Sequence, residues 1–158
     1  MDLILWRHAE AGDSLIDEVA DLDRPLKSKG ERQAQRVADW LNQFLPDSAR
    51  ILTSPALRCV QTAAALGRRV KKVEALGPAG TVEGLLAAAR WPEAKEAVLI
   101  VGHQPTLGMV AAYLMCGEAA RFSEPWSIKK GSVWWLRHRP REDRAEVQIV
   151  AVRTAEGL

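Results

Sequence analysis

Two short, uninterrupted runs of apolar residues constrain the fold of this chain more than any other feature. One run covers residues 3–6, and the other, at 97–101, is the cleanest in the sequence. Continuous apolar runs of this length are typical of strands covered on both faces, as in parallel sheets. The chain is therefore expected to place a sheet between layers of helices.

The segments around these runs alternate between helical and extended patterns. Helices are predicted at 28–45, 55–70, 81–90 and from 105 to about 117, and further strands at 50–53 and, on an edge, at 70–76. A capping box of Ser28 and Glu31 should begin the first helix, and Ser54 should be the N-cap of the second. The polar, acidic segment 9–25 shows no convincing period, so it is predicted to form a loop over the site.

The carboxyl-terminal part of the chain predicts a β-hairpin. Residues 132–136 and 146–152 have the pattern of strands, and the charged segment 137–144 lies between them as a turn. Trp126, Trp134 and Trp135 are expected to pack this hairpin. The predicted fold class is α/β: a three-layer α/β/α sandwich with a mostly parallel central sheet and an antiparallel edge hairpin. Residues 1–158 are expected to form one domain.

Composition excludes several classes of protein. The formal net charge of +2, from 22 basic and 20 acidic residues, is too small a surplus to indicate nucleic-acid binding. No signal peptide and no membrane-spanning run is recognisable, so a cytoplasmic protein without a membrane partner is expected. Cys59 and Cys116 lack metal-ligand spacing, and both are expected to be reduced, buried thiols.

Polar residues that can bind an anion follow three of the predicted strands. Arg7 and His8 follow the first strand, Ser54 and, one helical turn later, Arg58 follow the second, and His103 follows the fourth. In open α/β sheets, ligands bind beyond the carboxyl ends of the strands. Two guanidinium groups and two imidazoles are therefore expected to converge on one anion.

This set of side chains suits phosphoryl transfer, in which negative charge spreads over three equatorial oxygens. The guanidinium groups of Arg7 and Arg58 can each bind two of those oxygens, and His103 can donate a hydrogen bond to one of them. A neutral imidazole nitrogen of His8 can attack phosphorus while its other nitrogen donates to a backbone carbonyl. Neighbouring positive charge keeps such a nucleophile unprotonated.

Three ordered motifs resemble those of the histidine phosphatase superfamily: Arg7-His8-Ala9, Ser54-Pro55-x-x-Arg58-x-x-Gln61-Thr62, and Gly102-His103-Gln104-Pro105. Asp21-x-x-Arg24-Pro25-Leu26-x-Ser28-x-Gly30 looks like the SixA-type phosphohistidine phosphatase branch. The resemblance implies that His8 is transiently phosphorylated and that neither a metal nor a cofactor is needed. It also implies that Arg7, Arg58 and His103 bind the phosphoryl group, and it assigns Arg24, Asp21 and Ser54 to substrate binding.

The chain departs from the family pattern at two places. Ala9 stands where the signature has glycine, and we expect it to be tolerated unless the backbone there requires a positive φ or a ligand approaches it very closely. The segment 76–81 contains no carboxylate, whereas relatives that act on phosphate esters usually carry a glutamate there to protonate the leaving alkoxide. Glu10, Asp21 and Glu83 are the candidates for a replacement acid, although Glu83 is more simply explained as a partner of a helix dipole.

An imidazole leaves more readily than an alkoxide, so the missing acid favours phosphohistidine as the substrate. The leading hypothesis is a phosphohistidine phosphatase that acts on a protein such as a histidine phosphotransfer domain, with phosphate or a similar anion in the pocket. The alternatives are a phosphomonoesterase for small metabolites and a noncatalytic module that binds phosphoanions.

Overall fold

The strands form one six-stranded sheet in the order β3-β2-β4-β1-β5-β6 in the computed structural model, which describes all 158 residues. The strands are β1 (Asp2–Arg7), β2 (Arg50–Thr53), β3 (Lys71–Lys72), β4 (Val98–Gly102), β5 (Val133–Pro140) and β6 (Ala145–Arg153). The first four strands of this order are parallel, while β5 pairs antiparallel with both β1 and β6. The predicted mostly parallel sheet with an antiparallel edge hairpin is confirmed.

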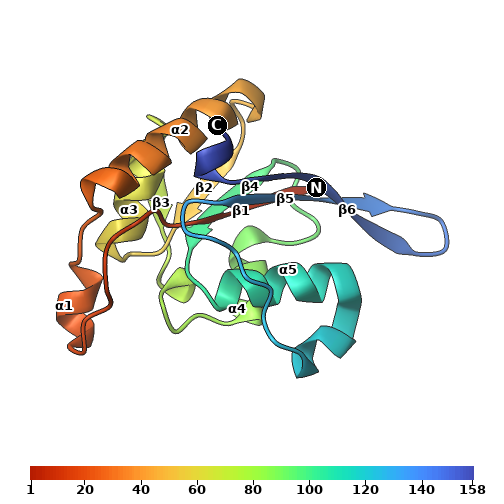
Figure 1. Cartoon of the computed structure of the whole chain (residues 1–158). Coiled ribbons are helices and arrows are strands. Elements are labelled where there is room, and N and C mark those ends of the chain that lie inside the picture. Colours follow the sequence, from red (N-terminus) through yellow and green to blue (C-terminus); the bar gives the residue numbers. More distant parts are fainter.

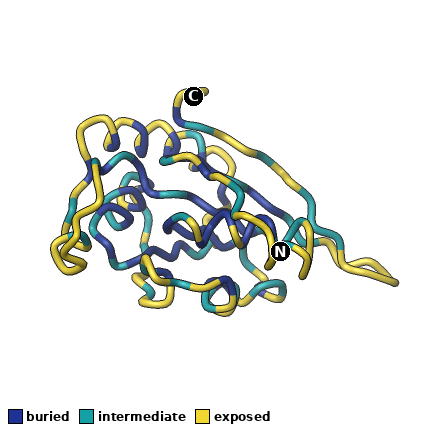
Figure 2. The backbone as a smooth tube through the Cα atoms, turned by 60° about the horizontal axis from the view of Figure 1, so that its bottom comes forward, coloured by how far each residue is buried: buried dark blue, intermediate teal, exposed yellow.

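Helices cover both faces of the sheet, as Figure 1 shows. The helices are α1 (Glu18–Leu22), α2 (Ser28–Phe44), α3 (Leu57–Ala64), α4 (Val82–Ala89) and α5 (Thr106–Cys116), with 3₁₀ turns at Glu74–Leu76, Gly117–Phe122 and Ala155–Gly157. Side chains of α2 and α3 join one apolar cluster, and those of α4 and α5 join another on the opposite face. The buried strands β1 and β4 are the two central strands of the sheet, and the buried backbone lies in the interior of the molecule (Figure 2), so the three-layer arrangement is confirmed. None of the helices has the length and apolar character that crossing a membrane would require.

Several predicted elements differ from the structure at their ends. The segment predicted as a loop contains the short helix α1, whose first N–H groups are capped by the Asp17 carboxylate. The predicted capping box at Ser28 is wrong, because Lys27 is the N-cap of α2 and no side chain caps it. Helix α3 begins only at Leu57, after the N-cap Ala56, so the prediction of Ser54 as its N-cap is also wrong.

The carboxyl-terminal hairpin is longer than the sequence pattern indicates. Both strands continue into the charged segment that was predicted as a turn, because the charged side chains of an edge hairpin can project into solvent while the backbone remains paired. Trp126 packs against Trp134 with ring centroids 5.6 Å apart, and Trp135 meets Trp40 edge to face. The expectation of two buried thiols is right for Cys59 and wrong for Cys116, which is exposed at the end of α5.

Residues of α2 and α3 hold the segment that follows β1 in place. A Cβ atom at Gly30 would lie 2.0 Å from the Glu10 carbonyl oxygen, so only glycine permits this close approach. Thr62 Oγ1 accepts from the Ala9 N–H at 3.0 Å, and Gln61 Oε1 accepts from the Leu26 N–H at 2.8 Å. The adjacent residues Gln61 and Thr62 of the second motif therefore fix the backbone at both ends of the segment 9–25, the active-site loop.

Candidate active site

A cavity of about 220 Å³ lies at the carboxyl ends of β1 and β4. No hydrophobic residue lines it, and four of its eleven lining residues are arginine or lysine. The lining residues are Arg7, His8, Gly12, Ser14, Asp21, Arg24, Arg58, Pro78, His103, Gln104 and Lys130. The four residues predicted to form the catalytic centre therefore share one cavity, together with Arg24 and Asp21.

His8 is held in the form that a nucleophile requires. Its Nδ1 lies 2.8 Å from the Ala9 carbonyl oxygen, which can only accept a hydrogen bond, so the proton resides on Nδ1 and the Nε2 lone pair is free. Burial, together with the positive charges of Arg58, Arg7 and Arg24, lowers the pKa of His8 from 6.5 to about 4, against the opposing effect of the Ala9 bond. Ala9 itself does not have a positive φ, so the backbone here does not require glycine.

His103 lies beside His8, with ring centroids 5.4 Å apart. Its Nε2 is 2.8 Å from Ser54 Oγ, and the same oxygen accepts from the Ala56 N–H at 3.1 Å. This contact fixes the orientation of the His103 ring with the proton on either nitrogen, because a hydroxyl group can both donate and accept. Nδ1 of His103 lies 3.5 Å from Nη2 of Arg58, so the imidazole and the guanidinium group border the same part of the cavity.

The guanidinium groups of Arg7 and Arg58 enter the site from different elements and are both partly satisfied by the backbone. Arg7 Nη1 donates to the Ile128 carbonyl at 2.8 Å, and Arg58 Nη1 donates to the Asp21 carbonyl at 2.9 Å. The Nε atoms of both arginines are buried and have no acceptor within the protein. Buried donors of charged groups without a partner are rare, so these two are suited to bind an anionic ligand.

Asp21 and Arg24 reach the cavity from the end of α1 and the residues that follow it. Arg24 Nε donates to Asp21 Oδ1 at 3.0 Å, and Arg24 Nη1 donates to the carbonyl oxygens of Ala11 and Gly12. Asp21 Oδ2 lies 3.3 Å from Arg58 Nη2. The loop motif thus connects a cavity-lining carboxylate to two of the cavity's three guanidinium groups.

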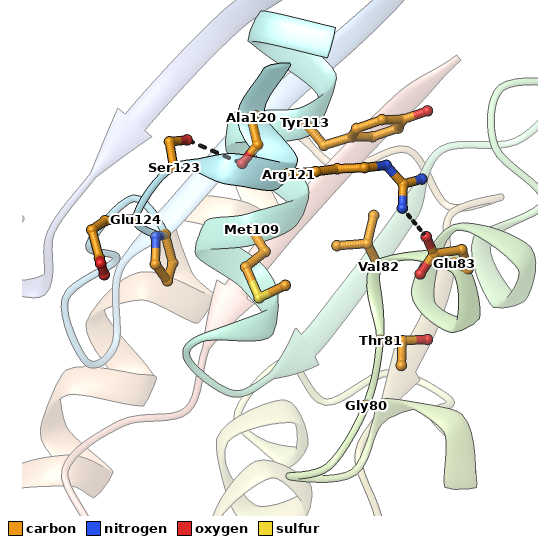
Figure 3. A pocket seen from close by; sticks show the side chains of 11 residues that line it. Gly80, Thr81, Val82, Glu83, Met109, Tyr113, Ala120, Arg121, Ser123 and Glu124 are labelled. Atoms are coloured by element: carbon orange, nitrogen blue, oxygen red, sulfur yellow. Dashed lines mark hydrogen bonds and ion pairs between the residues drawn. The ribbon is translucent and has the colours of Figure 1, made fainter. Parts of the chain in front are cut away.

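The other residues singled out from the sequence lie outside the cavity lining. Ser54 is fully buried and acts on the site through His103. Glu10 accepts from the Gly12 N–H and from Lys130 Nζ, at 2.9 and 3.1 Å. Glu83 lines a separate cavity between α4, α5 and the turn after α5, where it pairs with Arg121 at 2.8 Å (Figure 3). From the segment without a carboxylate, Pro78 lines the catalytic cavity.

Sequence reasoning missed Lys130, which lines the cavity from the segment before β5. It lies more than a hundred residues from Glu10, its partner, and nothing in the sequence distinguishes it from other surface lysines. Gln104 also lines the cavity, but both ends of its amide are engaged within the fold: Nε2 donates to the Trp126 carbonyl, and Oε1 accepts from the Gly108 N–H. It thereby fixes the start of α5 next to His103.

The lowered pKa of His8 makes a prediction for the free protein. Since the pKa lies near 4, the Cε1–H resonance of His8 is expected to keep the chemical shift of a neutral ring as pH falls from 8 to 5. An exposed histidine would titrate near pH 6.5 over the same range. NMR titration, with the signal assigned by its loss in His8→Ala, tests this directly. A midpoint between pH 6 and 7 would contradict the electrostatic description of the site.

The fold and the cavity are those of a phosphatase, with two histidines surrounded by cationic side chains that can bind phosphate. Comparison with known sequences agrees, because the profile of the histidine phosphatase superfamily (branch 1) matches residues 3–85. The chain belongs to this superfamily.

Individual relatives place the chain near the SixA proteins. It is 32% identical over 127 residues to phosphohistidine phosphatase SixA of Escherichia coli K12, covering 75% of this chain and 76% of that protein. An uncharacterized protein of Picosynechococcus is 38% identical over 144 residues, or 87% of this chain and 85% of its own. The solved structure of a putative SixA from Nakamurella superposes with a TM-score of 0.74 at 29% identity, covering 96% of this chain and 94% of that one.

Proposed function

We propose that this phosphatase hydrolyses phosphohistidine on a protein, through a covalent phosphohistidine on His8. The observation that carries the proposal is the absence of an available acid among the residues that line the catalytic cavity. Asp21 is the only carboxylate there, and it is paired with Arg24 and Arg58. The similarity to a phosphohistidine phosphatase of E. coli supports the same substrate class.

The argument from the missing acid depends on the leaving group. An alkoxide is strongly basic and needs a proton in the transition state, which a general acid supplies for a gain of about 10²–10⁴-fold. The pKa of Asp21 is lowered by the hydrogen bond that it accepts from the Leu15 N–H and by the nearby Arg24 and Arg58. This carboxylate is therefore ionised and has no proton to give. An imidazole whose other ring nitrogen carries a proton departs as a neutral ring without such help, so the cavity suits a phosphorus–nitrogen bond better than an alkyl ester.

The proposed reaction has two steps at one site. In the first, His8 Nε2 attacks phosphorus while Arg7, Arg58 and His103 bind the phosphoryl oxygens, and the electron pair of the breaking bond returns to the substrate nitrogen. In the second, water attacks the phosphorylated His8 and releases phosphate. The Ala9 carbonyl holds the Nδ1 proton of His8 through both steps, so the ring returns in the form in which it started.

The surface beside the cavity favours a protein over a small metabolite as the carrier of the phosphoryl group. Leu15, Ile16, Val19 and Leu22 are exposed, and Ile16 is fully so. All four lie within the segment that also supplies Ser14, Asp21 and Arg24 to the cavity. A protein that inserts a phosphorylated side chain into the cavity would cover these apolar side chains, whereas a small ester would not reach them.

A panel of phosphoryl donors tests the proposal. Relative values of kcat/KM for a histidine-phosphorylated phosphotransfer domain and for free phosphohistidine are expected to exceed those for alkyl phosphates such as phosphoserine by about 100-fold or more, the contribution of a general acid. Aryl esters such as 4-nitrophenyl phosphate should be turned over as well, because their leaving group needs no proton. Comparable turnover of alkyl esters would instead indicate a small-metabolite phosphomonoesterase, and a noncatalytic module would form no phosphoenzyme with any donor.

A further inference from the structure

We infer that Asp21 determines specificity by accepting a hydrogen bond from the unphosphorylated ring nitrogen of the substrate's imidazole. This role rests on the proposed function, because it applies only to a phosphohistidine donor. It makes Asp21 an electrostatic partner of the leaving group, a role distinct from that of the missing general acid.

The bonding of the two Asp21 oxygens supports this role. Oδ1 accepts from the Leu15 N–H at 2.9 Å and from Arg24 Nε at 3.0 Å, so the carboxylate is fixed in place. Oδ2 makes only the 3.3 Å ion pair with Arg58 Nη2. An ionised carboxylate oxygen can accept more than one hydrogen bond. Asp21 therefore presents a rigid acceptor with free capacity at the wall of the cavity.

The charge of the cavity explains why such an acceptor is needed. Phosphohistidine is most reactive when its other ring nitrogen is protonated, because the ring then leaves as neutral imidazole. That protonated ring is cationic, and the cavity already holds Arg7, Arg24, Arg58 and Lys130. These positive charges disfavour the protonated ring. Asp21 is the one negative charge among the lining residues, and a charge-assisted hydrogen bond to the ring N–H offsets the repulsion.

With this partner, no proton has to move during phosphoryl transfer. The substrate ring starts with a proton on one nitrogen and phosphorus on the other, and His8 starts with a proton on Nδ1 and a lone pair on Nε2. The new bond forms at Nε2, the old bond breaks, and its electron pair stays on the substrate nitrogen. Both protons remain on their nitrogens, one beside the Ala9 carbonyl and the other beside Asp21, and the net charge of the complex is unchanged.

The same geometry discriminates against alkyl esters. An ester oxygen carries no proton for Asp21 to accept, and a developing alkoxide near an ionised carboxylate is repelled. Asp21 would therefore favour phosphohistidine and disfavour esters at once. An uncharged amide at this position would weaken both effects while keeping the size of the side chain.

The test compares Asp21→Asn with wild type on two donors, free phosphohistidine and 4-nitrophenyl phosphate. The ratio of their kcat/KM values is expected to fall by about 10- to 100-fold in the variant, the value of a hydrogen bond to a charged group. Asp21 also orients Arg24 and Arg58, and losing that role alone would lower both rates equally and leave the ratio unchanged. Asp23→Asn is the matched control, because Asp23 is exposed and does not line the cavity.

The outcomes separate this inference from the proposed function. An unchanged ratio in Asp21→Asn, with wild type still preferring phosphohistidine to phosphoserine, would overturn the role of Asp21 alone. A wild type without that preference would overturn the proposed function itself. If the ratio also falls in Asp23→Asn, the effect comes from the charge of the loop. The inferred hydrogen bond from the substrate to Asp21 would then be overturned.

Discussion

Replacement of His8 by alanine is expected to abolish phosphate release from phosphohistidine, lowering kcat by about 10⁴-fold or more, as for other covalent nucleophiles. The reason is that no other side chain in the cavity can take its place. His103 has Nε2 engaged with Ser54, and the thiol of Cys59 is fully buried, which raises its pKa to about 12. A label that is labile in acid and stable in base should appear on wild type with a phosphohistidine donor and be missing from the variant.

The third histidine of the chain supplies the control for this experiment. His138 lies in β5 and packs against Trp91, with ring centroids 5.5 Å apart and no contact with the cavity. His138→Ala should keep both the label and the turnover, and circular dichroism should show that each variant retains its secondary structure. Labelling of His8→Ala at the rate of wild type would remove the proposed nucleophile.

Much of the candidate site could be predicted because its residues follow the ends of strands. A buried strand is recognisable from four apolar residues, and the residue that follows it must face the edge of the sheet where parallel strands end. This rule brings together His8 and His103, which lie 95 residues apart in the sequence. Arg58 joins them because side chains on a helix lean toward its start.

Contacts made across the chain could not be predicted in the same way. Ser54 before Pro55 has the pattern of a helix cap, but its hydroxyl contacts His103, and the helix begins three residues later. Lys130 reaches the cavity only because the segment before β5 folds back beside β1. Such placements depend on tertiary packing, for which a single sequence provides no periodic signal.

Replacement of Arg58 by alanine is expected to lower kcat/KM by about 10²–10³-fold, the usual effect of removing one preorganised donor from a transition-state site. Arg58 supplies the Nη2 group that faces Nδ1 of His103 and a buried Nε without an acceptor in the protein. Affinity for tungstate, a tetrahedral oxyanion that resembles phosphate, should fall in parallel when it is measured by calorimetry. Arg58→Lys should recover only part of the activity, because a lysine keeps the charge but cannot bind two oxygens at once.

A control variant distinguishes the specific effect of Arg58 from a general loss of positive charge. Arg69 lies beyond the end of the same helix, is exposed and does not line the cavity, so Arg69→Ala should keep wild-type kcat/KM and tungstate affinity. Arg58 also holds the Asp21 carbonyl and carboxylate, and its loss releases the active-site loop as well as the anion. Since Arg58→Lys retains a cation for both Asp21 and the anion, the difference between wild type and the lysine variant measures what the two-donor geometry of the guanidinium group adds. Equal activity of Arg58→Ala and wild type would mean that the guanidinium group of Arg58 does not bind the transferring group.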